Sequence, residues 1–582
     1  MIPLLSIQNL SISFRQEGKA VHVLHNISFS VKRGETVAIV GESGSGKSVT
    51  SLAVLQLLPV PPAAYTSGKI LFSAEGGTGV DLLKLPEKEM QYVRGNKIAM
   101  IFQEPMTSLN PLYTCGDQVT EAILLHQHIN YKAAKQKAVE LFEKVRLPGP
   151  AAVFNRFPHE LSGGQKQRVM IAMAMSCEPS LLIADEPTTA LDVTVQQSIL
   201  RLIKELQVEK NIGVIFISHD LGLVAEIADR AIVMFKGKII EQNTIHELFT
   251  DPRHPYTQAL LECRPVLHTK EERLPVVSDF MEINEDGNII RKERQYYDRK
   301  KTQHTTVPVK PDTPGIASPL VKVENLKVWF PVQRGMTGAH KHYIKAVDDV
   351  NFDIHEGETV GLVGESGCGK TTLGRCLLRL IDPTSGTVHF RAQNLLTLSP
   401  AQLRHVRKDF QIIFQDPYSS LNPRLSVGNA IQEGMSIHGI GSNDKNRKGL
   451  IINILEKVNL SADHYNRYPH EFSGGQRQRI GIARALALNP SFIVCDESVS
   501  ALDVSVQAQV LNLLNDLKRE FRFATLFISH DLSVVRYISD RILVMYNGKI
   551  EEAGPAEEVY NTPQSAYTRQ LIAAIPKGIL PG

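Results

Sequence analysis

The strongest constraint in this chain of 582 residues is that one long pattern occurs twice. GESGSGKS at Gly41–Ser48 returns as GESGCGKT at Gly364–Thr371, and LSGGQKQR at Leu161–Arg168 returns as FSGGQRQR at Phe472–Arg479. The tetrapeptide ISHD also occurs twice. The offset is 323 residues for the first pair and 311 residues for the later pairs. Solenoid units repeat every ~20–50 residues, so this spacing predicts two duplicated whole domains.

The repeat suggests where the domains begin and end. We expect a first domain over residues 1–264 and a second over residues 320–582. The intervening residues 265–319 are polar, charged and end in prolines, which is typical of a linker with some local structure.

Composition excludes several classes of protein. A net charge of +3 gives no sign of a nucleic-acid binder held by bulk electrostatics. The six cysteines are scattered with no CxxC pair, which disfavours a disulfide framework or a zinc site. We expect no signal peptide, and no stretch approaches the ~18 apolar residues of a membrane span. Any link to a membrane therefore requires a partner protein.

Each repeat alternates strand-like and helix-like segments, which predicts an α/β fold. The runs TVAIVG (Thr36–Gly41) and TVGLVG (Thr359–Gly364) are short, β-branched and apolar, as in buried strands that lead into glycine loops. SLLIADE (Ser180–Glu186) and SFIVCDE (Ser491–Glu497) also read as buried strands, and each ends in two carboxylates. Further apolar strands end in ISHD.

GxxxxGK[ST] between a strand and a helix predicts a phosphate-binding loop. The glycines let backbone N–H groups turn inward, and the helix N-terminus adds positive potential. We expect Lys47 and Lys370 to reach the β- and γ-phosphates of ATP, and Ser48 and Thr371 to bind Mg²⁺. Cys368 within the second loop suggests sensitivity to alkylation or oxidation. The predicted nucleotide-binding residues are Gly41, Ser43, Gly44, Ser45, Gly46, Lys47 and Ser48, and Gly364, Ser366, Gly367, Cys368, Gly369, Lys370 and Thr371.

The paired carboxylates at the strand ends predict two different roles for the two residues of each pair. Adjacent side chains at a strand end point to different sides, so one carboxylate can serve Mg²⁺ while the other faces an attacking water. We assign Asp185 and Asp496 to the metal, and Glu186 and Glu497 to the general base. A lone histidine is more often structural, but the ISHD histidines repeat at the same offset as the other motifs. His219 and His530 are therefore predicted to contact the γ-phosphate and to hold the water.

The order of these motifs resembles the ATP-binding-cassette ATPases, twice over. SGGQ lies just upstream of each acidic strand, and ALD follows at Ala190–Asp192 and Ala501–Asp503. The resemblance covers nearly all of the chain except the linker. It implies two tandem P-loop domains, each with a RecA-like core and a helical subdomain, paired head to tail within one chain around two ATP molecules. It further implies that Ser473, Gly474, Gly475 and Gln476 cover the ATP held by Lys47, and that Ser162, Gly163, Gly164 and Gln165 cover the ATP held by Lys370.

The same resemblance assigns two further pairs of residues. Gln103 and Gln415, in IFQEPMTSLNP and IFQDPYSSLNP, are expected to touch Mg²⁺ and the attacking water, in a loop that contacts a membrane partner. Phe14 and Phe330 are expected to stack on adenine. Both aromatic residues could instead be core residues, and Trp329 and Tyr343 are competitors for the second position.

Longer patterns narrow the subfamily. FQ[ED]PxxSLNP, HPYTQALL and SAYTRQLIAAIP resemble the ATPases of peptide and nickel importers, and the fusion of two cassettes resembles the ATPase subunits of bacterial importers of glutathione, dipeptides and peptide antibiotics. This resemblance implies two integral-membrane permeases, a periplasmic or lipid-anchored substrate-binding protein and no nucleic acid. It places the chain peripherally on the cytoplasmic face of the inner membrane, with contact to the membrane only through the permeases.

Two alternative functions remain open from the residues alone. A soluble tandem-cassette ATPase that acts on ribosomes or DNA would also have two cassettes and no membrane span. Such a protein usually needs a basic segment between its domains, whereas RKERQYYDRKK lies here among acidic runs. A regulatory scaffold that does not hydrolyse ATP is the second alternative.

Overall fold

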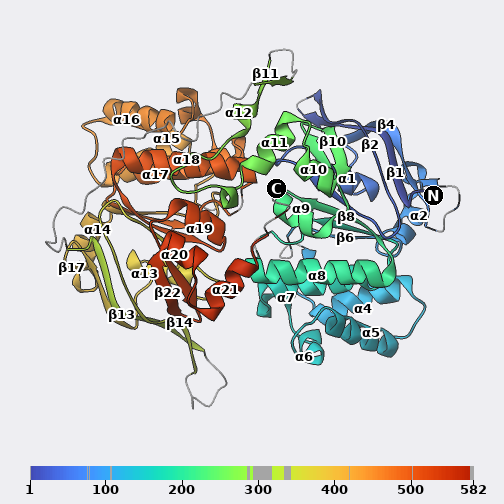
Figure 1. The fold of residues 1–582 in the computed structure, drawn as a ribbon, viewed down its shortest axis with the longest axis horizontal. Coiled ribbons are helices and arrows are strands. Elements are labelled where there is room, and N and C mark those ends of the chain that lie inside the picture. Colours follow the sequence, from blue (N-terminus) through green and yellow to red (C-terminus); the bar gives the residue numbers. More distant parts are fainter. Residues whose placement is uncertain are drawn as a thin grey trace. The chain divides into compact units, whose positions relative to one another are not determined.

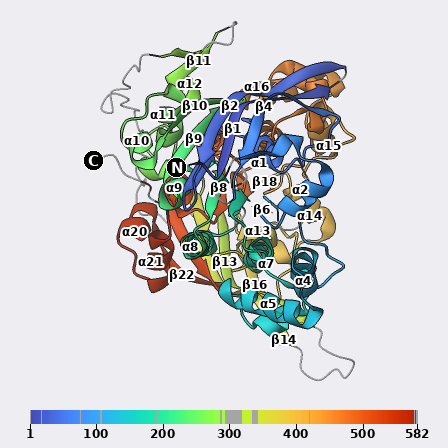
Figure 2. The same cartoon turned by 90° about the vertical axis from the view of Figure 1, so that its right-hand side faces the viewer.

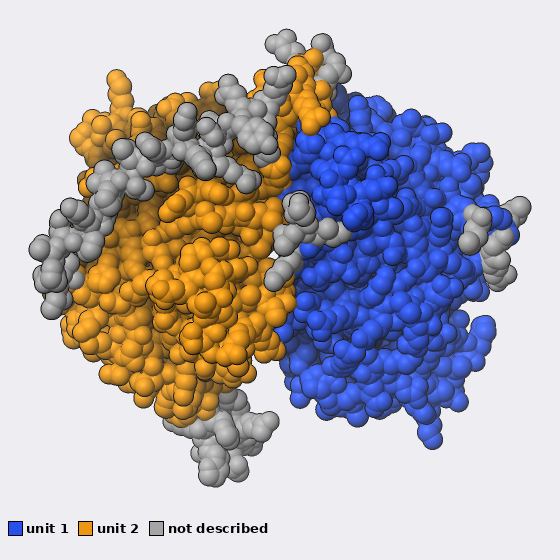
Figure 3. Space-filling view, viewed as in Figure 1, with its two compact units in different colours: residues 1–261, 576–582 blue, residues 262–575 orange. Residues whose placement is uncertain are grey.

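The chain folds into two compact units. The last residues of the chain belong to the first unit and not to the second. The computed structural model describes residues 2–16, 18–74, 77, 79–104, 108–189, 191–284, 289–292, 318–332, 342–418, 420–500, 502–576 and 578. Unit 1 comprises Met1–Leu261 and Pro576–Gly582, and unit 2 comprises Glu262–Ile575 (Figure 3). Ala190 and Ala501 of the ALD motifs, and residues 285–288 and 293–317 of the expected linker, lie outside the described residues.

Unit 1 contains an antiparallel sheet and a mostly parallel core sheet, and the antiparallel strands lie side by side in Figures 1 and 2. The antiparallel sheet has the order β2 (Lys19–Val31), β1 (Leu5–Gln16), β4 (Ala63–Phe72), β5 (Val80–Asp81). The core sheet has the order β10 (Lys238–Thr244), β9 (Arg230–Phe235), β3 (Thr36–Val40), β8 (Gly213–Ser218), β7 (Leu181–Asp185), β6 (Ile98–Ile101). Only the β9–β10 pair of this core sheet is antiparallel.

The helices of unit 1 fall into two groups. Helices α4, α5 and α6 gather at one side of the unit in Figure 1, beside α7, and form the expected helical subdomain. The helices are α1 (Lys47–Val54), α2 (Glu87–Val93), α4 (Cys115–His126), α5 (Tyr131–Lys144), α6 (Pro150–Phe154), α7 (Gly163–Met175), α8 (Val193–Lys210), α9 (Leu221–Ile227), α10 (Ile245–Thr250) and α11 (Pro255–Glu262), of which α11 ends in the first residue of unit 2. Short 3₁₀ turns are η1 (Leu82–Lys84) and η2 (Pro158–Glu160).

Unit 2 repeats this architecture. Its antiparallel sheet has the order β14 (His342–Ile354), β13 (Val321–Val332), β16 (Ser385–Phe390), β17 (Gln393–Asn394). Its core sheet has the order β18 (Phe410–Ile413), β19 (Phe492–Asp496), β20 (Ala524–Ser529), β15 (Thr359–Val363), β21 (Arg541–Tyr546), β22 (Lys549–Pro555). The helices are α13 (Lys370–Leu377), α14 (Pro400–Val406), α15 (Val427–Ile437), α16 (Asp444–Lys457), α17 (Gly474–Leu486), α18 (Val504–Phe521), α19 (Leu532–Ile538), α20 (Ala556–Asn561) and α21 (Ala566–Ala573), with 3₁₀ turns η4 (Leu395–Thr397), η5 (Ala462–Asn466) and η6 (Pro469–Glu471).

The beginning of the expected linker is ordered and belongs to unit 2. It forms η3 (Pro265–Leu267), α12 (Val277–Phe280) and the two-stranded sheet of β11 (Met281–Ile283) and β12 (Ile289–Arg291). Residues of this segment therefore pack with the second repeat, although they follow the first repeat in the chain.

The buried strands explain why both units adopt an α/β fold. All five residues of β3, β7, β15 and β19 are buried, as continuous apolar runs in parallel sheets should be when both faces are covered. The predicted α/β architecture and these four strands are therefore confirmed. Among the described residues, no helix combines the length and the apolar character needed to cross a bilayer.

Candidate functional site: two phosphate loops and their carboxylates

The glycine loops join the central strands to the helices that follow them. β3 leads through Gly41–Gly46 into α1, and β15 leads through the corresponding loop into α13. Gly46 and Gly369, which precede the lysines, have φ values of 102° and 110°. A Cβ at Gly369 would lie 1.9 Å from the carbonyl oxygen of Ala346. Only glycine fits such a turn, which brings successive N–H groups to the edge where parallel strands end.

The loop lysines lie inside these turns. Lys47 Nζ donates to the carbonyl oxygens of Gly41 at 2.7 Å and Glu42 at 3.0 Å. Lys370 Nζ donates in the same way to Gly364 and Glu365, at 2.7 and 2.8 Å. Both lysines are buried, with 5% and 4% of their surface exposed. Each ammonium group is therefore held at the centre of the loop, where it can bind phosphate oxygens.

The hydroxyl and carboxylate groups predicted to bind magnesium meet in each unit. Ser48 Oγ donates to Asp185 Oδ1 at 3.2 Å, and Thr371 Oγ1 donates to Asp496 Oδ1 at 2.8 Å. Burial raises the pKa of Asp185 to about 6, although the hydrogen bond from Ser48 opposes this rise. Burial likewise raises the pKa of Asp496. A buried carboxylate that lacks full compensation beside a hydroxyl is an oxygen donor set that suits Mg²⁺.

The second carboxylate of unit 1 points to a different set of partners. Glu186 Oε2 accepts from Gln103 Nε2 at 3.1 Å and from Thr189 Oγ1 at 3.0 Å, and lies 3.3 Å from His219 Nδ1. Burial alone would raise the pKa of Glu186, but the hydrogen bond with His219 and the charges of His219 and Lys47 hold it below its usual value. The carboxylate is therefore ionised near neutral pH, as a general base must be.

Unit 2 repeats this arrangement closely. Glu497 Oε2 accepts from Gln415 Nε2 at 2.9 Å and lies 3.4 Å from His530 Nδ1. Burial would raise the pKa of Glu497, but His530 and Lys370 hold it below its usual value. The structure thus brings together glutamine, glutamate and histidine in each unit, although they follow three different strands.

The backbone at both glutamates has a feature that the sequence did not reveal. Glu186 and Glu497 have φ values of 47° and 46°, in the left-handed region. Such a conformation costs a residue other than glycine about 1–3 kcal/mol, and it persists only where the surrounding structure stabilises it. Here the Glu186 N–H donates to the carbonyl oxygen of Ile217 at 3.0 Å, and the Glu497 N–H donates to Ile528 at the same distance. These bonds stabilise the left-handed backbone at the residue that directly follows each aspartate.

The two signature motifs form helix N-termini. Ser162 caps α7 and Ser473 caps α17, and each exchanges hydrogen bonds with the glutamine three residues later. A Cβ at Gly164 would lie 2.7 Å from Val195 Cγ1, so this glycine allows close packing against α8. A Cβ at Gly474 would have no neighbour within 4 Å. Each signature therefore presents the first turn of a helix, and the pairing of one signature with the other unit's phosphate loop stays a prediction.

The proposed adenine-stacking residues differ in exposure. Phe14 is partly buried and packs against the core beneath the antiparallel sheet of unit 1. Phe330 is 41% exposed on β13. Its competitor Trp329 is engaged with Tyr343, with ring centroids 6.2 Å apart, and with the ammonium of Lys345 4.6 Å from its ring. Tyr343 is 45% exposed, so exposure does not separate it from Phe330, and both stacking roles stay predictions.

The expected sensitivity of Cys368 finds no support in its surroundings. The side chain is buried, with 7% of its surface exposed. Burial raises the pKa of the thiol, although Lys370 opposes this rise. A buried thiol with a raised pKa forms little of the reactive thiolate.

Sequence reasoning missed a tyrosine that supports each phosphate loop. The hydroxyl of Tyr256 in α11 accepts a hydrogen bond from the Glu42 N–H at 3.0 Å. The hydroxyl of Tyr567 in α21 accepts one from the Glu365 N–H at the same distance. Both tyrosines occur in the repeated tail patterns HPYTQALL and SAYTRQLI, so the repetition was the available signal. Because they bind the backbone of the loop, we expect both tyrosines to act as positioning residues.

We expect Tyr256→Phe and Tyr567→Phe to raise the KM for ATP about 2- to 10-fold with a smaller change in kcat. Loss of the acceptor leaves a backbone donor of the loop without this partner, and a neutral hydrogen bond contributes about 0.5–1.5 kcal/mol. Steady-state ATPase kinetics give both constants. Tyr131→Phe is the matched control, because this exposed tyrosine bonds only Asp117 at 3.2 Å among the described contacts. An unchanged KM in both loop variants would contradict the positioning role.

Comparison with known proteins identifies the family of this chain. The family model of the ABC transporter matches residues 24–189 and 347–500, and the model of the oligopeptide/dipeptide transporter C-terminal region matches residues 240–289 and 551–578. The glutathione import ATP-binding protein GsiA of Salmonella choleraesuis is 48% identical over 577 residues, which cover 98% of this chain and 89% of the relative. GsiA of Escherichia coli is 47% identical with the same coverage.

A solved structure of the ATP-binding cassette MJ0796, in a post-hydrolysis state bound to ADP and Pi, is 30% identical; the match covers 98% of that chain and 40% of this one, with a TM-score of 0.37. Two family-model matches in tandem, together with the full-length relatives, show the family. The protein belongs to the ABC transporter family and is an ATPase that carries two ATP-binding cassettes in one chain.

Proposed function

We propose that this ATPase powers the import of glutathione, or of another short peptide, across the cytoplasmic membrane. The observation that carries the proposal is the 48% identity over 98% of the chain to a relative named as a glutathione import ATP-binding protein. The oligopeptide/dipeptide C-terminal region after each cassette supports the same class of cargo. This relative's name favours an importer over a soluble factor for ribosomes or DNA.

In the proposed reaction each site hydrolyses ATP with water as the nucleophile. Lys47 and Lys370 bind the β- and γ-phosphates, and Glu186 and Glu497 accept the proton of the attacking water. The glutamine and histidine beside each glutamate orient that water and the γ-phosphate. Mg²⁺ bound by Ser48 and Asp185, or by Thr371 and Asp496, would neutralise phosphate charge. Because both sites keep the same residues at similar distances, we propose two competent sites.

The proposal includes closure of the two cassettes around the nucleotides. Each signature helix has N–H groups at its first turn that can bind phosphate oxygens. The phosphates in question belong to an ATP that is bound at the same time by the phosphate loop of the other cassette. In a head-to-tail pair, the signature of one cassette would cover the ATP bound to the other. ATP binding would then close the pair, and hydrolysis would reopen it.

Two integral-membrane subunits, and a periplasmic or lipid-anchored binding protein, are the proposed partners, and the chain would attach peripherally to the cytoplasmic face. Near the glutamine loop of unit 2 lies a hollow of about 500 Å³, lined by Arg375, Leu380, Ile381, Phe414, Ser420 and Arg484. The corresponding residues of unit 1 are Leu52 for Arg375 and Met173 for Arg484. Two basic residues of this hollow thus correspond to apolar residues of unit 1, and this difference supports docking of two different membrane subunits.

Reconstitution tests the cargo. The protein is combined in proteoliposomes with the membrane subunits and binding protein encoded beside it. We expect glutathione-loaded binding protein to raise the ATPase rate several-fold over unloaded binding protein, and labelled glutathione to accumulate. Dipeptide-loaded binding protein tests the other short peptides of the proposal, whereas stimulation by nickel-loaded binding protein alone would replace the peptide cargo with nickel. If no loaded binding protein changes the ATPase rate and the chain co-purifies with ribosomes, the importer proposal is wrong.

A further inference from the structure

The segment that leaves the first cassette is built into unit 2. Two of its side chains, Cys263 and Leu274, have exposed fractions of 0% and 1%. They belong to the same apolar core as the residues of α17, α18 and α19. The turn η3 (Pro265–Leu267) lies against α19. We call residues Glu262–Leu274 the strap.

Two buried side chains of unit 2 hold the backbone of the strap. Asn512 on α18 pairs with Leu274 through both of its amide atoms: its Oδ1 accepts from Leu274 N at 3.1 Å, and its Nδ2 donates to Leu274 O at 2.9 Å. The hydroxyl of Tyr537 on α19 donates to the carbonyl oxygen of Glu272 at 2.9 Å. Asn512 is 4% exposed and Tyr537 1% exposed. A buried amide pair of this kind specifies one register of the strap, because a shift would leave polar groups unpaired.

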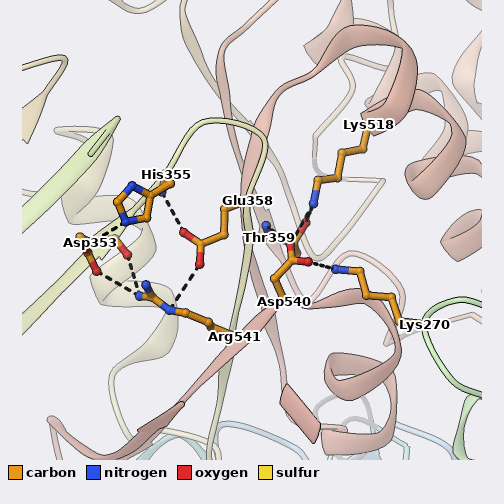
Figure 4. Close-up of polar contacts among 8 residues, drawn as sticks. All are labelled: Lys270, Asp353, His355, Glu358, Thr359, Lys518, Asp540 and Arg541. Carbon is orange, nitrogen blue, oxygen red and sulfur yellow. Dashed lines mark hydrogen bonds and ion pairs between the residues drawn. The ribbon is translucent and has the colours of Figure 1, made fainter. Parts of the chain in front are cut away.

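The strap also places the cation Lys270 against a carboxylate of unit 2, beside Lys518 of α18. Lys270 forms an ion pair with Asp540, and Lys518 lies 3.1 Å from the same carboxylate. Figure 4 shows both ammonium groups directed at Asp540. Asp540 Oδ2 accepts from the N–H of Thr359, the first residue of β15, at 2.8 Å. Burial would raise the pKa of Asp540, but Lys270 and Lys518 hold it below its usual value.

A second ion pair lies three residues further along the strap. Arg273 Nη1 is 2.9 Å from Asp516 Oδ2, and the two side chains are 67% and 45% exposed. Exposed pairs of this kind are weak and are screened by salt. The buried contacts of Leu274 and Tyr537 therefore contribute most to the binding of the strap to unit 2. The ion pairs make this binding weaker at high salt.

The corresponding surface of unit 1 lacks the asparagine and the tyrosine that bind the strap. At the offset of 311 residues, Asn512 corresponds to Arg201, and Tyr537 corresponds to Glu226. Asp540 corresponds to Asp229, which still accepts from the first N–H of β3 at 2.8 Å. The carboxylate that anchors the central strand is thus common to both units, whereas the residues that bind the strap backbone occur only in unit 2.

A shorter exchange occurs in the opposite direction. Pro576, which corresponds to Pro265 of the strap, belongs to unit 1. A Cβ at Gly222 on α9 would lie 3.1 Å from the carbonyl oxygen of Pro576. The segment that follows the first cassette therefore contacts α19 of the second repeat, and Pro576, which follows the second cassette, lies near α9 of the first repeat. Each of these helices follows an ISHD histidine.

We infer that the strap is a latch that keeps the two cassettes associated without nucleotide, and that the residues of α18 and α19 that contact it form its binding surface. The first cassette is covalently joined to a segment that is folded into unit 2, so association requires neither ATP nor an intact connection through residues 293–317. The inference does not depend on the cargo or on the import function.

The inference is tested by cleaving the full-length protein between the strap and the second cassette. A specific protease site is introduced within residues 300–310, the purified chain is immobilised by an N-terminal tag and cleaved, and release of the C-terminal fragment is followed in EDTA without nucleotide. We expect the wild-type fragment to be retained. Asn512→Arg, which copies unit 1, and Leu274→Ser are each expected to release it at least tenfold faster, and 0.5 M salt is expected to accelerate release of the wild-type fragment.

Arg201→Asn is the matched control, because it changes the corresponding position of α8, where Arg201 bonds only Gln197 among the described contacts. It should release the fragment at the wild-type rate. Leu274→Ser lies outside the cassette helices and strands, so it remains informative if Asn512→Arg folds poorly. Immediate release of the wild-type fragment, or equal retention of wild type and Leu274→Ser, would overturn the inference.

Discussion

Replacement of both general bases, Glu186→Gln with Glu497→Gln, is expected to lower the ATPase rate about 10²–10³-fold while ATP still binds. Glutamine keeps the size of glutamate and can retain contacts with the neighbouring glutamine and histidine, but it cannot accept the proton of the attacking water. Each single variant is expected to lose activity to the same extent, within about twofold, because both carboxylates have the same partners and a pKa below the usual value. Phosphate release with Mg-ATP measures the rate.

Glu209→Gln serves as the control, since this glutamate is half exposed and pairs only with surface lysines in the described structure. It should leave the rate unchanged. If Glu186→Gln abolishes turnover while Glu497→Gln leaves it intact, the two sites are not equivalent, and one of them has another role. An active double variant would remove both glutamates from the mechanism.

Replacement of the loop lysines is expected to change the number of nucleotides bound. Lys47→Ala should leave one high-affinity ATP per chain, and Lys47→Ala with Lys370→Ala should leave none. Each charge-assisted hydrogen bond to a phosphate oxygen contributes about 1.5–3 kcal/mol, which corresponds to a tenfold to hundredfold loss of affinity at the altered site. Equilibrium dialysis with labelled ATP and EDTA counts the sites without hydrolysis.

Lys236→Ala is the matched control for charge, because Lys236 is exposed in unit 1. Two sites should remain in this variant. Two sites of wild-type affinity in the double lysine variant would show that the loops do not bind the nucleotide. Loss of both sites in a single variant would show instead that occupation of one loop requires the other.

The local chemistry of each site was predictable from the sequence because its parts are short and self-contained. A phosphate loop needs only a buried strand, a few glycines and the first turn of a helix, all within about ten residues. The strands that end in Asp185 and Asp496 were predictable for the same reason, since continuous apolar runs lie between polar segments. A single histidine is weak evidence for a catalytic role. Because the ISHD histidine occurs at the same place in both repeats, the two histidines together became candidates for the site.

Contacts between distant parts of the chain were not predictable in this way. Tyr256 and the Glu42 N–H are 214 residues apart, and the tyrosine gave no sign that its hydroxyl would face a phosphate loop. The boundary between the units showed the same difficulty: Leu274 lies in a polar segment expected to be a linker, yet it is buried in the core of unit 2. One leucine among charged residues has no period that predicts burial.

The amino-acid sequence by itself determined which groups can bind phosphate, ligate a metal and activate water, because those functions depend on residue types within short stretches of backbone. Only the tertiary structure decided which distant groups support them: the left-handed turn at Glu186, the tyrosine behind each loop, and the docking of the strap against Asn512 and Tyr537. The physical reason is that such contacts arise from the packing of whole elements, and no local pattern records which surfaces that packing brings together.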